Sequence, residues 1–372
     1  MRAPLTPQQQ EALRRQCSLH VSGHALGAPG EELVRVGEWC RAHGAYADRY
    51  GDGEFIASFE SKVAALLGKP AAVFMPSGTM AQLIALRIWC QRAGKNHVAM
   101  HPTSHLELHE ERAYAHLHRL TVSLLGPRER LPAAADLASC TEAIATLVVE
   151  LPAREIGGQL PAWDELEELV GIARMRAIRL HLDGARLWEA RESYGHKSLA
   201  DICAKFDSVY VSFYKGVGAL AGAMLLGPED FIAEARVWRR RQGGTLVQLH
   251  PLVASAAMRL DAQLEKMPVY RARAISFAAG LGGIDGLAIV PTPPQVNLFH
   301  VHFAFPQAAV TAARDAIAAE ERAWLAPSIA AGPLPRWSRT ELYVGDNLLA
   351  LDAAAVLPLF AKLVDLARTA SA

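Results

Sequence analysis

Short apolar runs alternate with amphipathic stretches through the first two thirds of the chain. The apolar runs predict strands at residues 71–75, 97–100, 120–125, 145–151, 177–183, 209–214 and 223–226. The amphipathic stretches predict helices at residues 6–17, 56–67, 104–114 and 163–175, and from the turn at 76–79 to about 93. Strands that alternate with helices indicate an α/β fold, with a mostly parallel sheet flanked by helices on both faces.

The pattern changes after about residue 264. Residues 296–303 and 341–344 predict strands and residues 353–370 predict a closing helix, so we expect a smaller α+β unit in this part of the chain. The expected organisation is an N-terminal segment over residues 1–45, a large α/β domain over 46–270 and a small C-terminal α+β domain over 271–372.

The charge and cysteine content narrow the possible partners. The 372 residues include 38 Lys and Arg and 38 Asp and Glu, so the formal net charge is zero, with no electrostatic signature of nucleic-acid or anionic-membrane binding. No apolar stretch approaches the roughly 18 residues of a membrane span, and the N-terminus lacks the apolar segment of a signal peptide. The five cysteines are scattered without a CxxC pair. We therefore expect a cytoplasmic protein that binds neither nucleic acid nor membrane.

A candidate phosphate site follows the first predicted strand of the large domain. Ser77, Gly78 and Thr79 begin a helix at the carboxyl end of this strand, which is where open α/β sheets bind their ligands. The free N–H groups and the dipole of such a helix attract phosphate. The same three residues are also an ordinary helix N-cap sequence, so this motif alone leaves both interpretations open.

Two further strand ends carry charged groups. Asp183 closes an apolar strand and could pair with a cation, bind a metal or form only a salt bridge with Arg186. Lys215 follows the apolar run 209–214, where a lysine either extends into solvent or uses its amine chemically. Together, a phosphate cradle, a buried carboxylate and a strand-end lysine are what pyridoxal 5′-phosphate (PLP) requires. The three strand ends therefore predict a PLP site.

Six histidines are concentrated in one short part of the chain: His97, His101, His105, His109, His116 and His118. Spacings of four residues suggest a metal site, but Pro102 interrupts a continuous helical face and no HExxH motif is present. We therefore predict no metal. One imidazole is expected to lie against the pyridine ring of the cofactor, and the other five are expected to be surface or core residues.

The motifs and their order resemble a known family. Tyr50-Gly51-Asp52, PSGTMAQ, Ser104-His105, DGARLWEA, SFYKG and Gly243-Gly244 extend over more than half of the chain, and Lys215 follows the aspartate of DGAR by 32 residues. This pattern resembles the L-threonine aldolase/β-eliminating lyase family of fold-type-I PLP enzymes. The resemblance implies an aspartate-aminotransferase-like large domain, an amino-acid substrate and a homodimer or homotetramer.

The resemblance also implies roles for individual residues. Lys215 would be the Schiff-base lysine, Asp183 the partner of the pyridine nitrogen, and His105 the imidazole that stacks on the ring and could act as a base. Arg186 would lie near the substrate carboxylate. The residues that would bind the cofactor are Ser77, Gly78, Thr79, His105, Asp183, Arg186 and Lys215.

Three positions depart from the family pattern. Ala153 stands where the family carries a histidine that contacts the substrate β-hydroxyl, and Val247 stands where it carries a phosphate-binding arginine. Glu341 occupies the position of an arginine that binds the substrate carboxylate. Arg339 precedes Glu341 by two residues, on the same face of a predicted strand, and is expected to take this role.

The leading functional hypothesis is a PLP-dependent carbon–carbon lyase that cleaves a β-hydroxy-α-amino acid into glycine and an aldehyde through Lys215. With the family histidine missing at Ala153, His105 or a water would act as base. The alternatives are another PLP reaction on an amino acid (β-elimination, racemisation or transamination) and a catalytically idle PLP-binding protein. A metal-dependent hydrolase that uses the histidines is a further alternative.

Overall fold

The computed structural model describes residues 5–24 and 27–371, which form two compact units. The large unit comprises Gly27–Glu155 and Leu160–Met267. The small unit comprises the described residues of Met1–Leu26, Ile156–Gln159 and Pro268–Ala372. The sequence analysis sets residues 1–45 apart as one segment, whereas the contacts group residues 5–24 with the small unit and residues 29–42 with the large unit.

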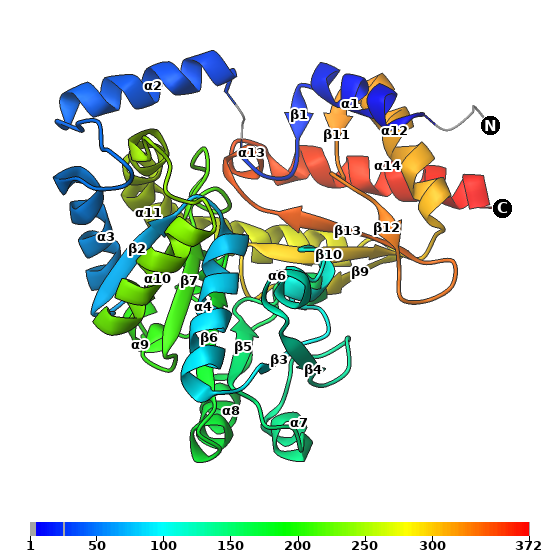
Figure 1. The fold of residues 1–372 in the computed structure, drawn as a ribbon. Helices are drawn as coiled ribbons and strands as arrows, with labels where there is room; N and C mark the ends of the chain where they lie inside the picture. Colours follow the sequence, from blue (N-terminus) through cyan, green and yellow to red (C-terminus); the bar gives the residue numbers. More distant parts are fainter. Residues whose placement is uncertain (1–4, 25–26, 372) are drawn as a thin grey trace. The chain divides into compact units, whose positions relative to one another are not determined.

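A seven-stranded sheet forms the centre of the large unit (Figure 1). Its strands are β2 (Ala71–Met75), β3 (His97–Met100), β4 (Thr121–Leu124), β5 (Thr146–Glu150), β6 (Arg179–Gly184), β7 (Ser208–Ser212) and β8 (Ala223–Gly227). Their order is β2-β8-β7-β6-β5-β3-β4. Only β8 runs antiparallel to its neighbours, so the prediction of a mostly parallel sheet is confirmed.

Helices cover this sheet, as expected for strands whose residues are buried on both faces. They are α2 (Pro29–Ala42), α3 (Glu54–Leu66), α4 (Gly78–Ala93), α5 (His105–Leu108), α6 (Ala113–His118), α7 (Ala134–Ser139), α8 (Trp163–Met175), α9 (Leu199–Cys203), α10 (Glu229–Arg241) and the start of α11 (His250–Gly282). The 3₁₀ turns η1 (Arg154–Ile156) and η2 (Leu187–Ala190) follow β5 and β6. Helix α4 packs against β2, β7, β8 and α10 and is buried over most of its surface.

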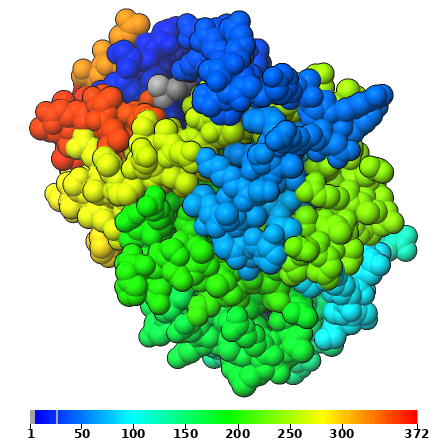
Figure 2. Space-filling view, turned by 90° about the vertical axis from the view of Figure 1, so that its left-hand side faces the viewer, coloured from blue at the N-terminus to red at the C-terminus, as the bar shows by residue number. Residues whose placement is uncertain are grey.

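Two helices of the large unit differ from the sequence prediction. The prediction of one helix over residues 104–114 is wrong, because Glu111 and Arg112 adopt positive φ angles of 49° and 53° and separate α5 from α6. Helix α2 was not predicted. It lies at the surface in Figure 2, and its Leu33 and Val34 are 60% and 57% exposed, so its apolar residues do not mark a core face.

The small unit is an α+β structure, as predicted. Its sheet has the antiparallel order β12-β13-β10-β9, and β1 pairs in parallel with β11. Its strands are β1 (Leu19–His20), β9 (Leu287–Val290), β10 (Leu298–Phe303), β11 (Ala323–Trp324), β12 (Ala330–Ala331) and β13 (Ser338–Tyr343), and its helices are α1 (Pro7–Gln16), the end of α11, α12 (Gln307–Glu321), α13 (Asp346–Leu349) and α14 (Ala353–Ser371).

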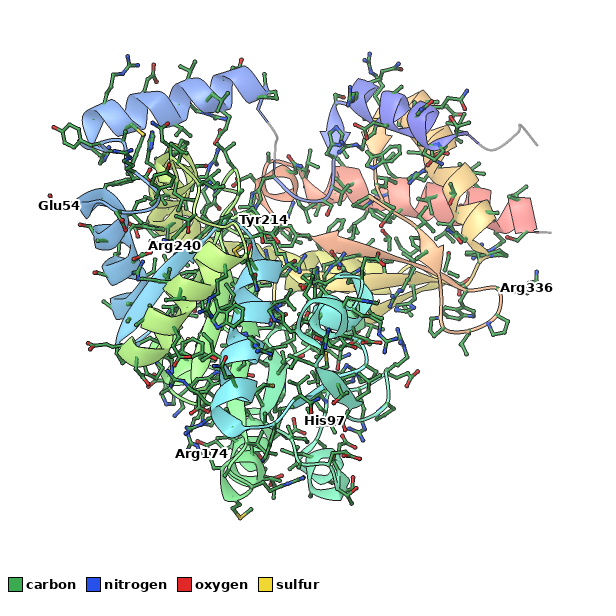
Figure 3. All side chains as sticks on the ribbon, in the orientation of Figure 1. Glu54, His97, Arg174, Tyr214, Arg240 and Arg336 are labelled. Carbon is green, nitrogen blue, oxygen red and sulfur yellow. The ribbon has the colours of Figure 1, made fainter. Side chains whose placement is uncertain are left out.

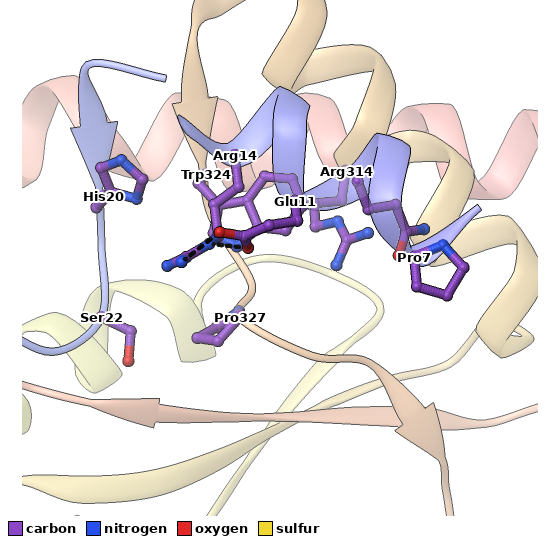
Figure 4. Close-up of a pocket in the computed structure, with 9 residues that line it drawn as sticks. Pro7, Glu11, Arg14, His20, Ser22, Arg314, Trp324 and Pro327 are labelled. Atoms are coloured by element: carbon purple, nitrogen blue, oxygen red, sulfur yellow. Dashed lines mark hydrogen bonds and ion pairs between the residues drawn. The ribbon is translucent and has the colours of Figure 1, made fainter. Parts of the chain in front are cut away.

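A pocket of about 270 Å³ lies within the small unit (Figure 4). It is lined by Pro7, Gln10, Glu11, Arg14, His20, Ser22, Arg314, Trp324 and Pro327. Arg14 pairs with Glu11 at 2.8 Å inside this group. None of the predicted site residues lines this pocket.

The buried side chain of Asp48 connects two segments of the large unit that are far apart in sequence. Its Oδ2 accepts a hydrogen bond from the Gly51 N–H at 2.7 Å, and its Oδ1 accepts from the N–H groups of Leu249 and His250 at 2.8 Å each. Burial alone would raise the pKa of Asp48, but the hydrogen bonds from His250 and Gly51 hold this pKa below its ordinary value. The carboxylate therefore fixes the turn at residues 50–52 to the start of α11.

We expect Asp48→Ala to lower the free energy of unfolding by about 2–3 kcal/mol, because it leaves buried N–H groups without an acceptor. Urea unfolding followed by tryptophan fluorescence measures this loss. The matched control is Asp261→Ala, since Asp261 is an exposed aspartate paired with Lys62 and should cost less than about 1 kcal/mol. Equal losses in the two variants would contradict the assigned role of Asp48.

Candidate active site

The start of α4 forms a cradle for an anion. Strand β2 ends at Met75, and the Oγ of Ser77 caps the helix by accepting a hydrogen bond from the Met80 N–H at 3.3 Å. The first N–H groups of a helix lack internal partners and carry its positive dipole end. A Cβ atom at Gly78 would collide with the hydroxyl and Cζ of Tyr210, so this position accepts only glycine. The geometry of Ser77, Gly78 and Thr79 therefore fits a phosphate.

A cavity of about 700 Å³ adjoins this helix start. Its lining residues are Ser77, Thr79, Met80, Leu83, Arg87, Leu117, His118, Arg119, Trp238, Arg241 and Gln242. Val247 is 61% exposed and carries no charge, but Arg241 lies in the lining beside Ser77 and Thr79. Arg241 is therefore the candidate to supply the phosphate-binding charge that the family pattern has at position 247 and that Val247 cannot supply.

Asp183, near the end of β6, is fully buried. Its Oδ2 accepts a hydrogen bond from Nε2 of Gln82 at 2.8 Å, and its Oδ1 accepts from the Ala185 N–H at 3.1 Å. Both partners are donors, which suits an ionised carboxylate. Gln82 lies in the PSGTMAQ motif on α4, but its role was not predicted, since the sequence does not show which strand end its side chain reaches.

Glu150 is a second carboxyl group at the same edge of the sheet. It pairs in register with Asp183 across β5 and β6, and its Oε1 accepts a hydrogen bond from the Arg154 N–H at 3.1 Å. Burial, followed by the charge of Asp183, raises the pKa of Glu150 to about 8. Glu150 therefore keeps its proton to a higher pH than an ordinary glutamate does. The sequence analysis did not identify it as a site residue.

Lys215 lies in the turn that follows β7, next to the exposed Tyr214 labelled in Figure 3. Its backbone carbonyl accepts a hydrogen bond from the Gly218 N–H at 3.0 Å. Burial lowers the pKa of Lys215 and the charge of Arg186 lowers it further, although Asp183 and Glu150 act in the opposite direction. A lysine with a lowered pKa has more of the neutral amine, which is the nucleophilic form.

Arg186 follows β6 and precedes η2. Its Nε atom is buried and has no hydrogen-bond partner among the described residues. A buried guanidinium donor without a partner requires an acceptor, and an anionic group of a ligand would satisfy it. The charges of Arg186 and Asp183 both affect the pKa of Lys215, which is consistent with the predicted association of these three residues.

His105 begins α5 and is oriented by a buried carboxylate. Its Nδ1 lies 2.9 Å from Oε1 of Glu110, whose side chain is only 2% exposed. A carboxylate only accepts hydrogen bonds, so Nδ1 carries the proton and Nε2 holds the lone pair. Glu110 also contributes, after burial, Asp183 and Tyr214, to the raised pKa of Tyr210.

The remaining candidates lie elsewhere. Arg339 is on β13 of the small unit, opposite His302 in the strand register, and its role at the substrate carboxylate stays a prediction. His97 contacts Thr121 and Ser123, and His101 contacts Thr103 and the carbonyl of Pro127. In residues 5–24 and 27–371, no three His, Cys, Asp or Glu side chains are arranged to hold a metal ion. No helix in these same ranges is long and apolar enough to span a membrane.

The donor set of the large unit fits PLP. It offers a helix start shaped for phosphate, a buried carboxylate for a pyridinium nitrogen, an imidazole for the ring and a lysine with a lowered pKa. The unpartnered Nε of Arg186 supplies a further donor for an anionic group.

Comparisons with known proteins agree with this assignment. Residues 38–305 match the beta-eliminating lyase family. The chain is 37% identical over 210 residues to the aldolase vrtJ of Penicillium aethiopicum, which covers 55% of this chain and 53% of that protein. It is 26% identical over 269 residues to the probable low-specificity L-threonine aldolase 2 of Arabidopsis thaliana, covering 68% and 74%. The chain thus spans about half the length of the fungal relative.

Two solved structures are similar over nearly the whole chain. One is a putative L-allo-threonine aldolase from Listeria monocytogenes, with a TM-score of 0.90 and 38% identity over 96% of this chain and 99% of the other. The second is a putative aromatic amino acid beta-eliminating lyase/threonine aldolase from Exiguobacterium, with a TM-score of 0.89 and 38% identity over 95% and 99%.

We expect Gly78→Ala to weaken PLP binding by about tenfold to a hundredfold, because the added methyl group displaces Tyr210 or the start of α4. Titration of the cofactor-free protein with PLP, followed by absorbance, measures the change in Kd. Gly171→Ala in α8 is the control, since a Cβ atom there meets no atom within 4 Å. An unchanged Kd in Gly78→Ala would show that this helix start does not hold the phosphate.

Glu150→Gln tests the protonated state of Glu150 through the stability of the cofactor-free protein. Because folding raises this pKa from 4.5 to about 8, the folded state retains a proton that the unfolded state has released. The free energy of unfolding should therefore fall as pH rises through this window, by at most about 1.4 kcal/mol per pH unit. Urea unfolding at several pH values should show a weaker decline in Glu150→Gln, and identical slopes would contradict the assignment.

Proposed function

Since the chain belongs to the beta-eliminating lyase family, we propose that it is a PLP-dependent aldolase that cleaves β-hydroxy-α-amino acids into glycine and an aldehyde. The observation that carries this proposal is the buried Asp183 on β6, held by Gln82, with Lys215 in the turn after the neighbouring strand β7. The predicted family, fold class and lyase class are confirmed by the family match and the similar structures.

Each part of the site has a role toward the cofactor. Ser77, Gly78 and Thr79 would hold the phosphate at the start of α4, and Lys215 would hold the carbonyl carbon covalently. When bound, PLP supplies an electron sink for the pair that is released when a bond to Cα of an amino acid breaks. His105 would lie against the ring, and its orientation is fixed by Glu110.

Asp183 and Glu150 differ in the form that their surroundings favour, which is ionised for Asp183 and neutral for Glu150. Asp183 would pair with the pyridine nitrogen and hold a proton there, because Gln82 and the Ala185 N–H already stabilise its charge. The raised pKa of Glu150 favours its neutral form, which adds no second negative charge beside Asp183. One net negative charge next to the nitrogen is what a protonated pyridine requires.

The substrate class is supported by the relatives named as aldolases. These include the fungal aldolase vrtJ, the Arabidopsis L-threonine aldolase and the Listeria protein described as a putative L-allo-threonine aldolase. Arg186, with its buried Nε donor, would bind the substrate carboxylate. We extend the proposal to a cytoplasmic homodimer or homotetramer, as the sequence resemblance implies.

The test is product identification with the PLP-loaded protein. We expect threonine, allo-threonine or phenylserine to yield glycine and the matching aldehyde. Lys215→Ala should lose the visible absorbance of the covalently bound cofactor and at least about 10³-fold of the rate, since it removes the covalent attachment.

The control reaction is the same incubation without added amino acid. In the incubation with an amino acid, release of ammonia and a 2-oxo acid, inversion of the α-carbon or transfer of the amino group would instead indicate another PLP reaction. A cofactor band without any product would indicate a binding protein, and a band that persists in Lys215→Ala would refute the assignment of Lys215.

A further inference from the structure

A second imidazole lies beside His105. The rings of His105 and His109 have centroids 5.1 Å apart and planes inclined by 46°. His109 ends α5 and is 39% exposed at its side chain, so solutes can reach it. The sequence analysis treated this residue as a surface or core histidine, because nothing in the local sequence shows its partner.

His109 has a carboxylate partner of its own. Its Nε2 lies 2.8 Å from Oε1 of Glu155, and this same oxygen accepts a hydrogen bond from Nη1 of Arg154 at 3.2 Å. Because a carboxylate only accepts, Nε2 carries the proton and the lone pair is on Nδ1. An imidazole oriented by a carboxylate in this way is the arrangement of a general base.

The segment that orients His109 also reaches the lysine site. Arg154 donates its backbone N–H to Glu150, and its charge is among the causes that lower the pKa of Lys215. The ion pair of Arg154 with Glu155 therefore connects His109 to the edge of the sheet where Glu150 and Asp183 lie side by side. Ala153 immediately precedes this pair and has no group that can move a proton.

We propose that His109 is the catalytic base that removes the β-hydroxyl proton of the substrate, with Glu155 and Arg154 as its positioning residues. This inference rests on the proposed aldolase function and assigns the proton transfer that the function needs. His105 is left to lie against the cofactor ring, so the two neighbouring imidazoles have separate tasks.

The proposed step balances in protons and electrons. The β-hydroxyl proton passes to Nδ1 of His109, and the O–H electron pair forms the second bond of the aldehyde carbonyl. The Cα–Cβ bond breaks, and its electron pair goes to Cα, where protonation then yields glycine. His109 returns its proton to water or to the product before the next turnover.

The decisive variant is His109→Gln, which removes the base and retains a polar side chain of similar reach. We expect kcat/KM for cleavage of threonine or phenylserine to fall by about 10²- to 10⁴-fold, the usual contribution of a general base. Exchange of the α-proton of glycine with solvent involves no β-hydroxyl group, so it should continue at the wild-type rate.

The matched control is His116→Gln, an exposed histidine of α6 outside the site, which should leave both rates unchanged. Wild-type cleavage in His109→Gln, or loss of glycine exchange together with cleavage, would overturn the role of His109 and leave the aldolase function standing. A wild-type protein that exchanges glycine but releases no aldehyde would overturn the proposed function, and the base with it.

A second readout needs neither activity nor cofactor. Nitrogen NMR of ¹⁵N-histidine-labelled cofactor-free protein reports which ring nitrogen carries the proton. We expect His109, assigned by its absence from His109→Gln, to be protonated at Nε2, and this preference to weaken in Glu155→Gln. Protonation at Nδ1 of neutral His109 would overturn the proposal, because the lone pair would then face Glu155.

Discussion

The buried charge of Asp183 is the constraint on which the rest of the site depends. A carboxylate without exposure is costly unless donors surround it, and Gln82 and the Ala185 N–H supply them. This negative charge then contributes to the pKa values of the groups around it. After burial, it is the second cause that raises the pKa of Glu150 across the strand register, and it likewise contributes after burial to the raised pKa of Tyr210. It also opposes the effect of burial on Lys215, whose pKa is lowered nonetheless. The pKa values of Glu150, Tyr210 and Lys215 therefore each depend partly on this one buried carboxylate.

The parallel sheet brings these groups together, because its strand ends place side chains from distant parts of the chain at one edge. Glu150 and Asp183 end adjacent strands, and Lys215 follows the next one. Helix α4 contributes twice: its first turn offers N–H groups to an anion, and Gln82 in its second turn reaches Asp183. Such a helix must be held firmly on all sides, which accounts for the burial of most of its residues. Strands β5 and β6 and helix α4 thus hold Glu150, Asp183 and Gln82 on regular elements, while Lys215 lies in the turn after β7.

The sequence predicted those parts of the site that depend on local pattern. Strand ends are visible as apolar runs that stop at a polar residue, so Asp183 and Lys215 stood out as candidates, and the cap at Ser77 has its own signature. Groups defined by non-local surroundings were missed: the raised pKa of Glu150 comes from burial and from Asp183, and His109 is oriented by Glu155, 46 residues away. The break after α5 was missed because positive φ angles at Glu111 and Arg112 are imposed by the surroundings, not by residue type.

Residues 105–110, which comprise α5 and the two residues after it, carry side chains with different proposed roles. His105, His109 and Glu110 lie within six consecutive residues, and the positive φ angles of Glu111 and Arg112 end the segment directly afterwards. The imidazole proposed to lie against the cofactor ring, the carboxylate that orients it and the second imidazole therefore lie in one short segment. A single recombination event or grafted segment could transfer or erase all three at once.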